Sequence, residues 1–308
     1  MYVIIATVLV VLIVAGAFAG LYLSNHATSG TTTSSSGQIQ VVAAENFWGS
    51  LITQLGGTRV SVLSIVSDPN ADPHEYESNT ANAIAIEHAS LVIVNGAGYD
   101  NWALKLIAAS NTPHQVVLNV QELINQPTGA NPHFWYSPTY VNETVNAMYQ
   151  DLVSIDPTHA AYYKQQYAAL NASLGVCNAR IAEIKQQFGG TKVASTESIF
   201  VYLANATGLD LVSPSAFMQA VSEGNDPPAQ SIVQFQQLIQ NGTVAVLVYN
   251  EQTVTPLTQN IKAQAAQQGI SLVGVTETIQ PPNATFQNWM NSQLITLQNA
   301  LNSQTPGK

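Results

Sequence analysis

The chain has 308 residues, of which 46% are hydrophobic and only 8% are charged, against roughly 25% charged residues in a typical soluble protein. The apolar content is enough for two α/β lobes with cores of their own, which excludes a disordered chain. With 8 Lys and Arg against 18 Asp and Glu, the formal net charge is −10, so the chain lacks the basic surface that nucleic-acid binding requires. We expect Asn, Gln, Ser and Thr to make up most of its polar surface.

A long apolar run at the N-terminus predicts a membrane anchor. Residues 2–23 carry no charged side chain, and as a helix rising about 1.5 Å per residue they would span about 30 Å of hydrocarbon. A cleaved signal peptide is the alternative, because the Ala-Phe-Ala at residues 17–19 resembles a cleavage site. Residues 24–37 are rich in Ser, Thr and Gly and predict a flexible tether. We therefore expect an anchor over 1–23, a tether over 24–37 and a globular part outside the cell.

Two further features agree with a position at the cell surface. Five Asn-x-Ser/Thr triplets predict a glycoprotein, at Asn142, Asn171, Asn205, Asn241 and Asn283. The single cysteine, Cys177, excludes an intrachain disulfide, and no lipid-attachment cysteine follows the apolar run. If the protein is exported, its own N-terminal segment is the anchor.

Short β-branched runs alternate with amphipathic segments along the rest of the chain. The first series predicts strands at 39–43, 60–65, 91–95 and 115–119, with helices at 47–55, 80–89 and 102–109 between them. The second predicts strands at 192–195, 244–249 and 271–276, and helices at 199–207, 229–240, 256–268 and 286–302. A βαβα order implies parallel sheets covered by helices. The sequence thus predicts an α/β fold with an N-terminal lobe over 38–158 and a C-terminal lobe over 189–308.

The segment between the two lobes predicts one long helix. Its apolar residues recur at alternating spacings of four and three from Tyr163 to Phe188, and Cys177 lies on the same stripe as a small apolar side chain. A helix over 159–188 would be roughly 45 Å long. We expect it to act as a spine that joins both lobes, with a homomeric coiled coil as the alternative.

Two histidines share a local pattern that suits metal binding. Residues 72–76 and 131–135 both read Asx-Pro-His-x-aromatic and present His74 and His133. Proline fixes φ before each histidine and the Asx side chain can close a turn, so both rings are held rigidly. Each motif follows a predicted strand, where open parallel sheets place their ligands. The two histidines are therefore candidate metal ligands in a cleft between the lobes.

Carboxylates to complete such a site must come from the second lobe. Glu197, Glu251 and Glu277 each follow a predicted strand there. Each of them can instead stabilise the N-terminus of a helix, so position alone leaves both readings open.

These motifs resemble those of the metal-binding solute-binding proteins of ABC transporters for zinc and manganese, a family that includes the streptococcal adhesin lipoproteins. The resemblance runs from about residue 38 to 302 and rests on residues 72–77, 95–100, 131–135 and 195–197, with Tyr202 following. It implies His74, His133 and Glu197 as ligands. Glu277 best matches the fourth ligand, although the usual residue there is Asp, and Glu251 is the alternative.

The resemblance also implies a function. The protein would capture a divalent metal as its transported ligand, Zn²⁺ or Mn²⁺ with Fe²⁺ also compatible, and pass it to a membrane ABC permease and its cytoplasmic ATPase. It would act as a monomer and not as an enzyme. Two histidines with two carboxylates lean towards Mn²⁺ yet still bind Zn²⁺ tightly. The alternatives are an extracellular metal-dependent hydrolase, with Glu197 or Glu251 as general base, and a glycosylated adhesive protein whose site has decayed.

Overall fold

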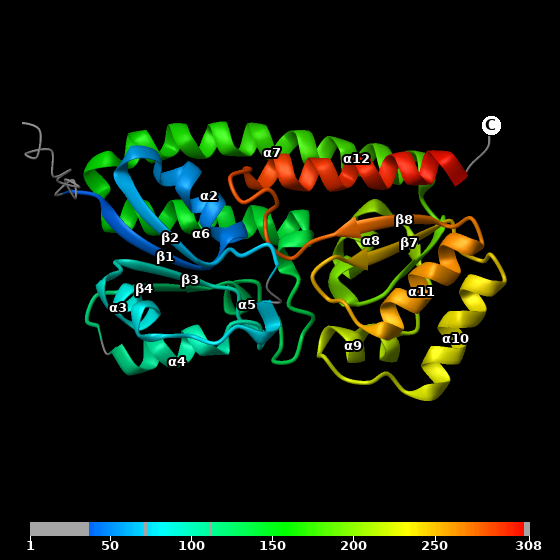
Figure 1. Ribbon diagram of the computed structural model, residues 1–308. Helices are drawn as coiled ribbons and strands as arrows, with labels where there is room; N and C mark the ends of the chain where they lie inside the picture. Colours follow the sequence, from blue (N-terminus) through cyan, green and yellow to red (C-terminus); the bar gives the residue numbers. More distant parts are fainter. Residues whose placement is uncertain (1–36, 71–72, 111, 305–308) are drawn as a thin grey trace, which may run out of the picture. The chain divides into compact units, whose positions relative to one another are not determined.

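The computed structural model describes residues 37–70, 73–110 and 112–304. The predicted anchor, and the predicted tether up to residue 36, lie outside these residues. Among the helices that the structure describes, none is both long enough and apolar enough to cross a membrane. The described residues from Ile39 onward form one compact unit, which contains two four-stranded parallel sheets (Figure 1).

The N-terminal lobe is a parallel sheet with helices on both faces. Its strands lie in the order β2-β1-β3-β4 and are β1 (Ile39–Glu45), β2 (Val60–Val66), β3 (Leu91–Val94) and β4 (Val116–Asn119). Its helices are α2 (Asn46–Gly56), α3 (Thr80–His88), α4 (Asn101–Ser110) and the short α5 (Val120–Leu123). Alternate residues of β1 enter different cores, Val41 with the side chains of α2 and Val42 with those of α3 and α4. Burial on both faces explains why these strands are nearly continuous apolar runs.

The C-terminal lobe repeats this arrangement. Its strands lie in the order β6-β5-β7-β8 and are β5 (Lys192–Ser195), β6 (Asp210–Leu211), β7 (Val246–Asn250) and β8 (Ser271–Val275). Its helices are α8 (Val201–Thr207), α9 (Ser215–Ser222), α10 (Ala229–Gln240), α11 (Pro256–Gln267) and α12 (Phe286–Gln304). The expected fold class, two parallel α/β lobes, is confirmed. The two-residue β6 and the helix α9 were not among the predicted elements.

Two long helices, α6 (Pro138–Ile155) and α7 (Ala160–Phe188), connect the sheets. The 29 residues of α7 correspond to the predicted spine, and its apolar stripe is buried from Tyr163 to Phe188, apart from the half-buried Tyr167. One part of α7 packs on α2 and α6, and another packs on α8 and α12 (Figure 1). The thiol of Cys177 donates a 3.4 Å hydrogen bond to the carbonyl of Gln287 in α12. The chain's own helices therefore cover the stripe, and no second copy is needed to bury it.

Loops at the carboxyl ends of the strands bring the two lobes together. Asn131 Nδ2 donates to the Ser198 carbonyl at 2.8 Å, and Tyr202 donates back to the Asn131 carbonyl at 2.8 Å. Tyr136 adds a 2.8 Å hydrogen bond to the carbonyl of Thr276, directly after β8. The edge at which open parallel sheets place their ligands is thus shared between the lobes.

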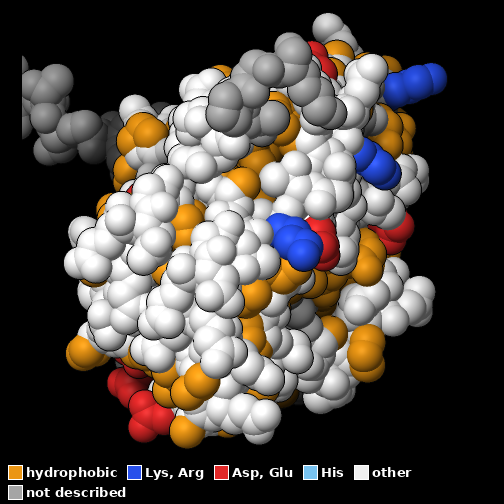
Figure 2. Space-filling model, turned by 90° about the vertical axis from the view of Figure 1, so that its right-hand side faces the viewer, with side chains coloured by type: hydrophobic (Ala, Val, Ile, Leu, Met, Phe, Trp, Pro, Cys, Tyr) orange, Lys and Arg blue, Asp and Glu red, His pale blue; other side chains and the backbone are white. Residues whose placement is uncertain are grey.

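The sparse charge of the sequence is visible on the surface (Figure 2). On the face drawn there, most atoms belong to the backbone or to uncharged polar side chains, and only a few side chains are charged. This agrees with the expected surface of Asn, Gln, Ser and Thr.

Candidate metal site

His133 is fixed by the turn that contains it. Asn131 Oδ1 accepts a 3.2 Å hydrogen bond from the backbone N–H of His133 and also lies 2.6 Å from its ring Nδ1. Because Asn131 Nδ2 donates to the Ser198 carbonyl, Oδ1 is the oxygen end of the amide, and the ring proton must lie on Nδ1. Nε2 then carries a lone pair, and it is buried with no hydrogen-bond partner among the described residues. Such an acceptor is suited to a metal ion.

His74 approaches His133 from the first Asx-Pro-His motif. It lies in a 3-10 turn, Pro73–Glu75, and its ring centroid is 5.7 Å from that of His133. Its Nε2 is 3.4 Å from Oε2 of Glu277, in the other lobe. The ring also stands edge-on to Tyr99 with centroids 4.7 Å apart. Asp72, which the motif predicts to close this turn, lies outside the described residues.

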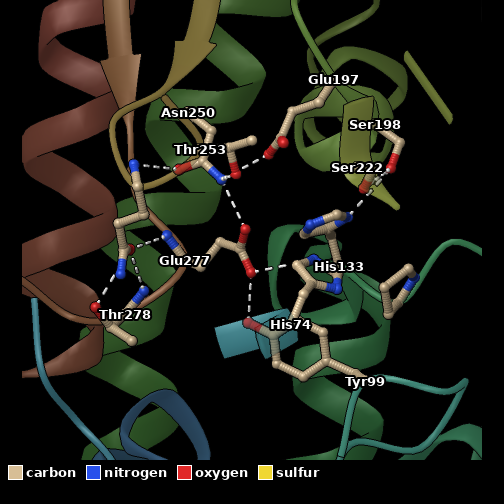
Figure 3. Close-up of polar contacts among 12 residues, drawn as sticks. His74, Tyr99, His133, Glu197, Ser198, Ser222, Asn250, Thr253, Glu277 and Thr278 are labelled. Carbon is tan, nitrogen blue, oxygen red and sulfur yellow. Dashed lines mark hydrogen bonds and ion pairs between the residues drawn. The ribbon is translucent and has the colours of Figure 1, made fainter. Parts of the chain in front are cut away.

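Glu277 lies two residues beyond the end of β8 and is fully buried. Its Oε2 accepts a 2.5 Å hydrogen bond from the Tyr99 hydroxyl, and its Oε1 accepts one of 2.6 Å from Asn250 Nδ2 (Figure 3). Gln252 Oε1 holds the backbone of the same loop by accepting the N–H of Glu277 at 2.8 Å. These neutral donors allow a carboxylate to be buried in the cleft.

Glu197 occupies the equivalent position after β5. It is also fully buried, and its Oε1 accepts a 2.7 Å hydrogen bond from the same Asn250 Nδ2. The backbone carbonyl of Glu197 accepts from the Ser195 hydroxyl at 2.8 Å, which fixes the turn out of the strand. One amide group therefore bridges the two carboxylates (Figure 3).

The structure brings three of the four predicted ligands into one group. His74, His133 and Glu277 each offer a ligand atom, and these atoms lie within 4.8 Å of one another. Glu197 is not part of that group and is linked to it through Asn250. Glu251, the alternative fourth ligand, is exposed and lines a different cavity beside Gly274.

Burial keeps His133 neutral. Loss of solvation, with a smaller contribution from the neighbouring His74, lowers the pKa of His133 well below its ordinary value. A neutral imidazole is the form that binds metal, so this ring stays competent as a ligand as the solution becomes acidic.

The loop over residues 95–100 aims Tyr99 at the site. Asp100 accepts hydrogen bonds from the backbone N–H groups of Asn95, at 2.5 Å, and Gly96, at 2.8 Å. Gly96 has a φ of 77°, and a Cβ there would lie 2.7 Å from the Cβ of Gln121. Only glycine fits this crowded left-handed position. The tight turn lets Tyr99, from the N-terminal lobe, reach Glu277 in the C-terminal lobe.

A second carboxyl group lies beneath this loop. Burial raises the pKa of Asp100 to about 6, although the N–H groups of Gly96 and Asn95 oppose the rise. Burial, together with the adjacent Asp100, raises the pKa of Glu45 well above its ordinary value, and Glu45 hydrogen-bonds to Asp100. The two buried carboxyl groups are therefore coupled, and their contact favours a proton shared between them.

A cavity of about 560 Å³ leads to the site, with walls from both lobes. Its lining includes His74, Tyr99, Asn131 and Ser198, together with the carboxylates of Glu75 and Glu223. Negative side chains along such an opening attract cations.

Three residues with clear roles here were not assigned one from the sequence. Tyr99 lies within the motif at residues 95–100, and Asn250 and Gln252 flank Glu251. The available signal was positional, because Asn250 is the last residue of a strand, at the edge where ligands bind.

Comparison with known proteins identifies the family. A family model described as the periplasmic component A of a zinc-uptake complex matches residues 41–300. The chain belongs to this family. The family predicted from the motifs is thereby confirmed.

Individual relatives have low sequence identity to this chain. The manganese-binding lipoprotein MntA of Halalkalibacterium halodurans is 31% identical over 139 residues, 43% of this chain and 45% of that protein. The chain thus spans about half the length of that relative. The metal ABC transporter substrate-binding lipoprotein FimA of Streptococcus parasanguinis is 24% identical over 246 residues, which cover 75% of this chain and 78% of that protein.

Solved structures share the fold. The periplasmic zinc-binding protein TroA of Treponema pallidum superimposes with a TM-score of 0.72 at 17% identity, covering 86% of this chain and 99% of that one. A crystal structure of ZnuA gives a TM-score of 0.69 at 22% identity, with coverage of 85% and 99%.

Proposed function

We propose that this protein is the substrate-binding component of an ABC importer and captures a divalent transition metal, Zn²⁺ or Mn²⁺, between its lobes. The observation that carries the proposal is the group formed by His74, His133 and Glu277, in which the buried Nε2 of His133 has no hydrogen-bond partner among the residues that the structure describes. Two imidazoles and a carboxylate are a donor set that suits these cations and also Fe²⁺. The metal is the transported substrate.

Glu197 is proposed as the fourth ligand. Its carboxylate is buried and held by the amide that also holds Glu277. We propose that it joins the group when the metal binds, so that each lobe supplies two ligands. Glu251 is a weaker candidate because it is exposed and lines another cavity.

The proposal extends to the partners and the location. Membership of the family supports a membrane permease with a cytoplasmic ATPase as the receiver of the metal. The N-terminal anchor over 1–23, the tether over 24–37, the lobe boundaries at 158 and 189, the monomeric state and the extracellular position remain predictions. Relatives such as MntA and FimA are described as lipoproteins, which agrees with attachment at a membrane surface.

The hydrolase alternative finds no support in these comparisons. The geometry also disfavours the suggested bases, because Glu251 lies outside the group and Glu197 is bound by Asn250. The structure likewise offers no reason to regard the site as decayed, since three predicted ligands converge.

Metal titration of the full chain tests the proposal. After removal of bound metal with a chelator, we expect one equivalent of Zn²⁺, Mn²⁺ or Fe²⁺ to bind, as followed by calorimetry. His74→Ala and His133→Ala should abolish this binding and metal uptake by cells, whereas His88→Ala, which alters an exposed histidine on α3, should not. Lack of stoichiometric binding by the unaltered chain would refute the function.

A further inference from the structure

Asn250 occupies a distinctive position in the C-terminal lobe. It is the last residue of β7, is 3% exposed, and belongs to the strand between β5 and β8. Glu197 follows β5 and Glu277 follows β8, so the strand order places both carboxylates beside the same amide. Nδ2 lies 2.6 Å from Glu277 Oε1 and 2.7 Å from Glu197 Oε1.

The orientation of this amide follows from its other end. Asn250 Oδ1 accepts the backbone N–H of Gln252 at 2.9 Å, so the NH₂ group must face the carboxylates. An NH₂ group has two hydrogens, and the two shortest contacts take them both to carboxylate oxygens. The hydroxyl of Thr253, at 2.9 Å, is a third and longer contact.

This arrangement limits how each carboxylate can bind a metal. A bidentate carboxylate gives both of its oxygens to one ion, but the amide already holds Oε1 of Glu197 and Oε1 of Glu277. Turning either Oε1 towards the ion would break a buried hydrogen bond to the amide, which is unfavourable. Glu277 therefore presents Oε2, which lies 3.4 Å from Nε2 of His74 and can bind an ion through its second lone pair while it accepts from the Tyr99 hydroxyl.

The number of donors then has a consequence for the substrate. With one nitrogen from each histidine and one oxygen from each carboxylate, the chain offers at most four donor atoms. Zn²⁺ prefers four-coordinate tetrahedral sites, whereas Mn²⁺ prefers six-coordinate sites that are rich in oxygen ligands. Building on the function proposed above, we propose that Asn250 is a selectivity residue, which makes both carboxylates monodentate and thereby favours Zn²⁺ over Mn²⁺.

Cobalt provides the first test, because four-coordinate Co²⁺ has intense visible absorption bands and six-coordinate Co²⁺ has weak ones. We expect the full chain, stripped of metal and loaded with Co²⁺, to show the intense bands. Weak bands would overturn the proposal without any substitution.

Substitution provides the second test. In Asn250→Ala both carboxylates can become bidentate, so we expect weaker Co²⁺ bands and a rise of about tenfold in Mn²⁺ affinity relative to Zn²⁺, measured by competition. The matched control is Thr253→Ala, which removes the third contact of the amide and keeps both carboxylate bonds. It should leave the ratio unchanged, and melting curves of both variants report on folding.

The outcomes separate this inference from the proposed function. An unchanged Mn²⁺/Zn²⁺ ratio in Asn250→Ala, with metal still bound, overturns the role of Asn250 and leaves the proposed function intact. Absence of stoichiometric binding of any of these metals to the unaltered chain overturns both.

Discussion

The two lobes have the same strand order but place different donors at the same edge. The N-terminal lobe places imidazoles there from Asx-Pro-His motifs, and the C-terminal lobe places carboxylates from residues just beyond β5 and β8. The neutral ring of His133 is buried although its Nε2 has no hydrogen-bond partner within the described part of the chain. The buried Glu277 instead takes hydrogen bonds from Tyr99 and Asn250. Parallel sheets thus determine where side chains meet, while the loop residues determine the chemistry and how much support it needs.

Removing a single donor, from either lobe, is expected to cause the largest loss of metal affinity. His133→Ala and Glu277→Gln should each lower Zn²⁺ affinity by more than about 100-fold, because loss of a supporting residue alone typically costs 10–100-fold. Competition with a coloured chelator measures this, with His88→Ala as the control. If either variant kept nearly full affinity, the site would belong to one lobe only.

Removing a residue that holds a donor in place, in either lobe, should cause the next largest loss of metal affinity. Asn131→Ala frees the Nδ1 proton of His133 and should cost roughly 10–100-fold in affinity. Gln252→Ala removes only a backbone anchor of Glu277 and should cost less than tenfold by the same reasoning. Nitrogen NMR of His133 distinguishes positioning from general damage, because only Asn131→Ala should change the tautomer. Equal losses of affinity in the two variants, with no change of the His133 tautomer in Asn131→Ala, would contradict this prediction.

Acid should destabilise the metal-free protein through His133. The pKa of His133 is lowered by burial, so below an unfolded value of about 6.5 the unfolded chain binds more protons than the folded chain. Stability of the metal-free protein should therefore fall as pH drops below this value and through the lowered folded pKa. Urea unfolding at a series of pH values checks this, and the component should be absent from His133→Ala. Metal affinity should fall over the range in which the ligands protonate.

The Glu45 and Asp100 pair should change the stability of the protein with pH in the opposite direction, and by a smaller amount. Both pKa values are raised, that of Asp100 to about 6, so above the unfolded value of about 4 the folded chain holds more protons. This contribution lowers stability as pH rises through the folded pKa values. Glu45→Gln should weaken that dependence, as measured by urea unfolding, while Glu87→Gln, at an exposed position, should not. A steeper dependence in Glu45→Gln would rule out the shared proton.

Local patterns predicted most of the fold. The spine was expected over 159–188 and α7 covers Ala160–Phe188, while α10 spans the predicted 229–240. The long α6 was not predicted, although Ser137 caps it and Pro138 occupies its first turn, both of which are recognised start signals. The strand β6 has two residues, too few to show any periodicity.

The residues of the candidate site also differ in whether a local sequence pattern predicts them. Its histidines were predictable because the Asx-Pro-His turn is encoded by adjacent residues, as the Asn131 turn shows. Tyr99, Asn250 and Gln252 were not, because each acts on Glu277 from a distant part of the sequence. The predicted set of two histidines and two carboxylates leans towards Mn²⁺, whereas the amide of Asn250 that bridges the carboxylates supports the proposed preference for Zn²⁺.

The sequence by itself determined the two α/β lobes, the long helix between them, the two rigid histidines and the family. Each of these depends on residues that are close in sequence, through periodicity or turn chemistry. Only the tertiary structure decided that Glu277 joins His74 and His133 and that Asn250 bridges it to Glu197. Those contacts depend on strand order and on the meeting of two sheet edges, which no local pattern specifies.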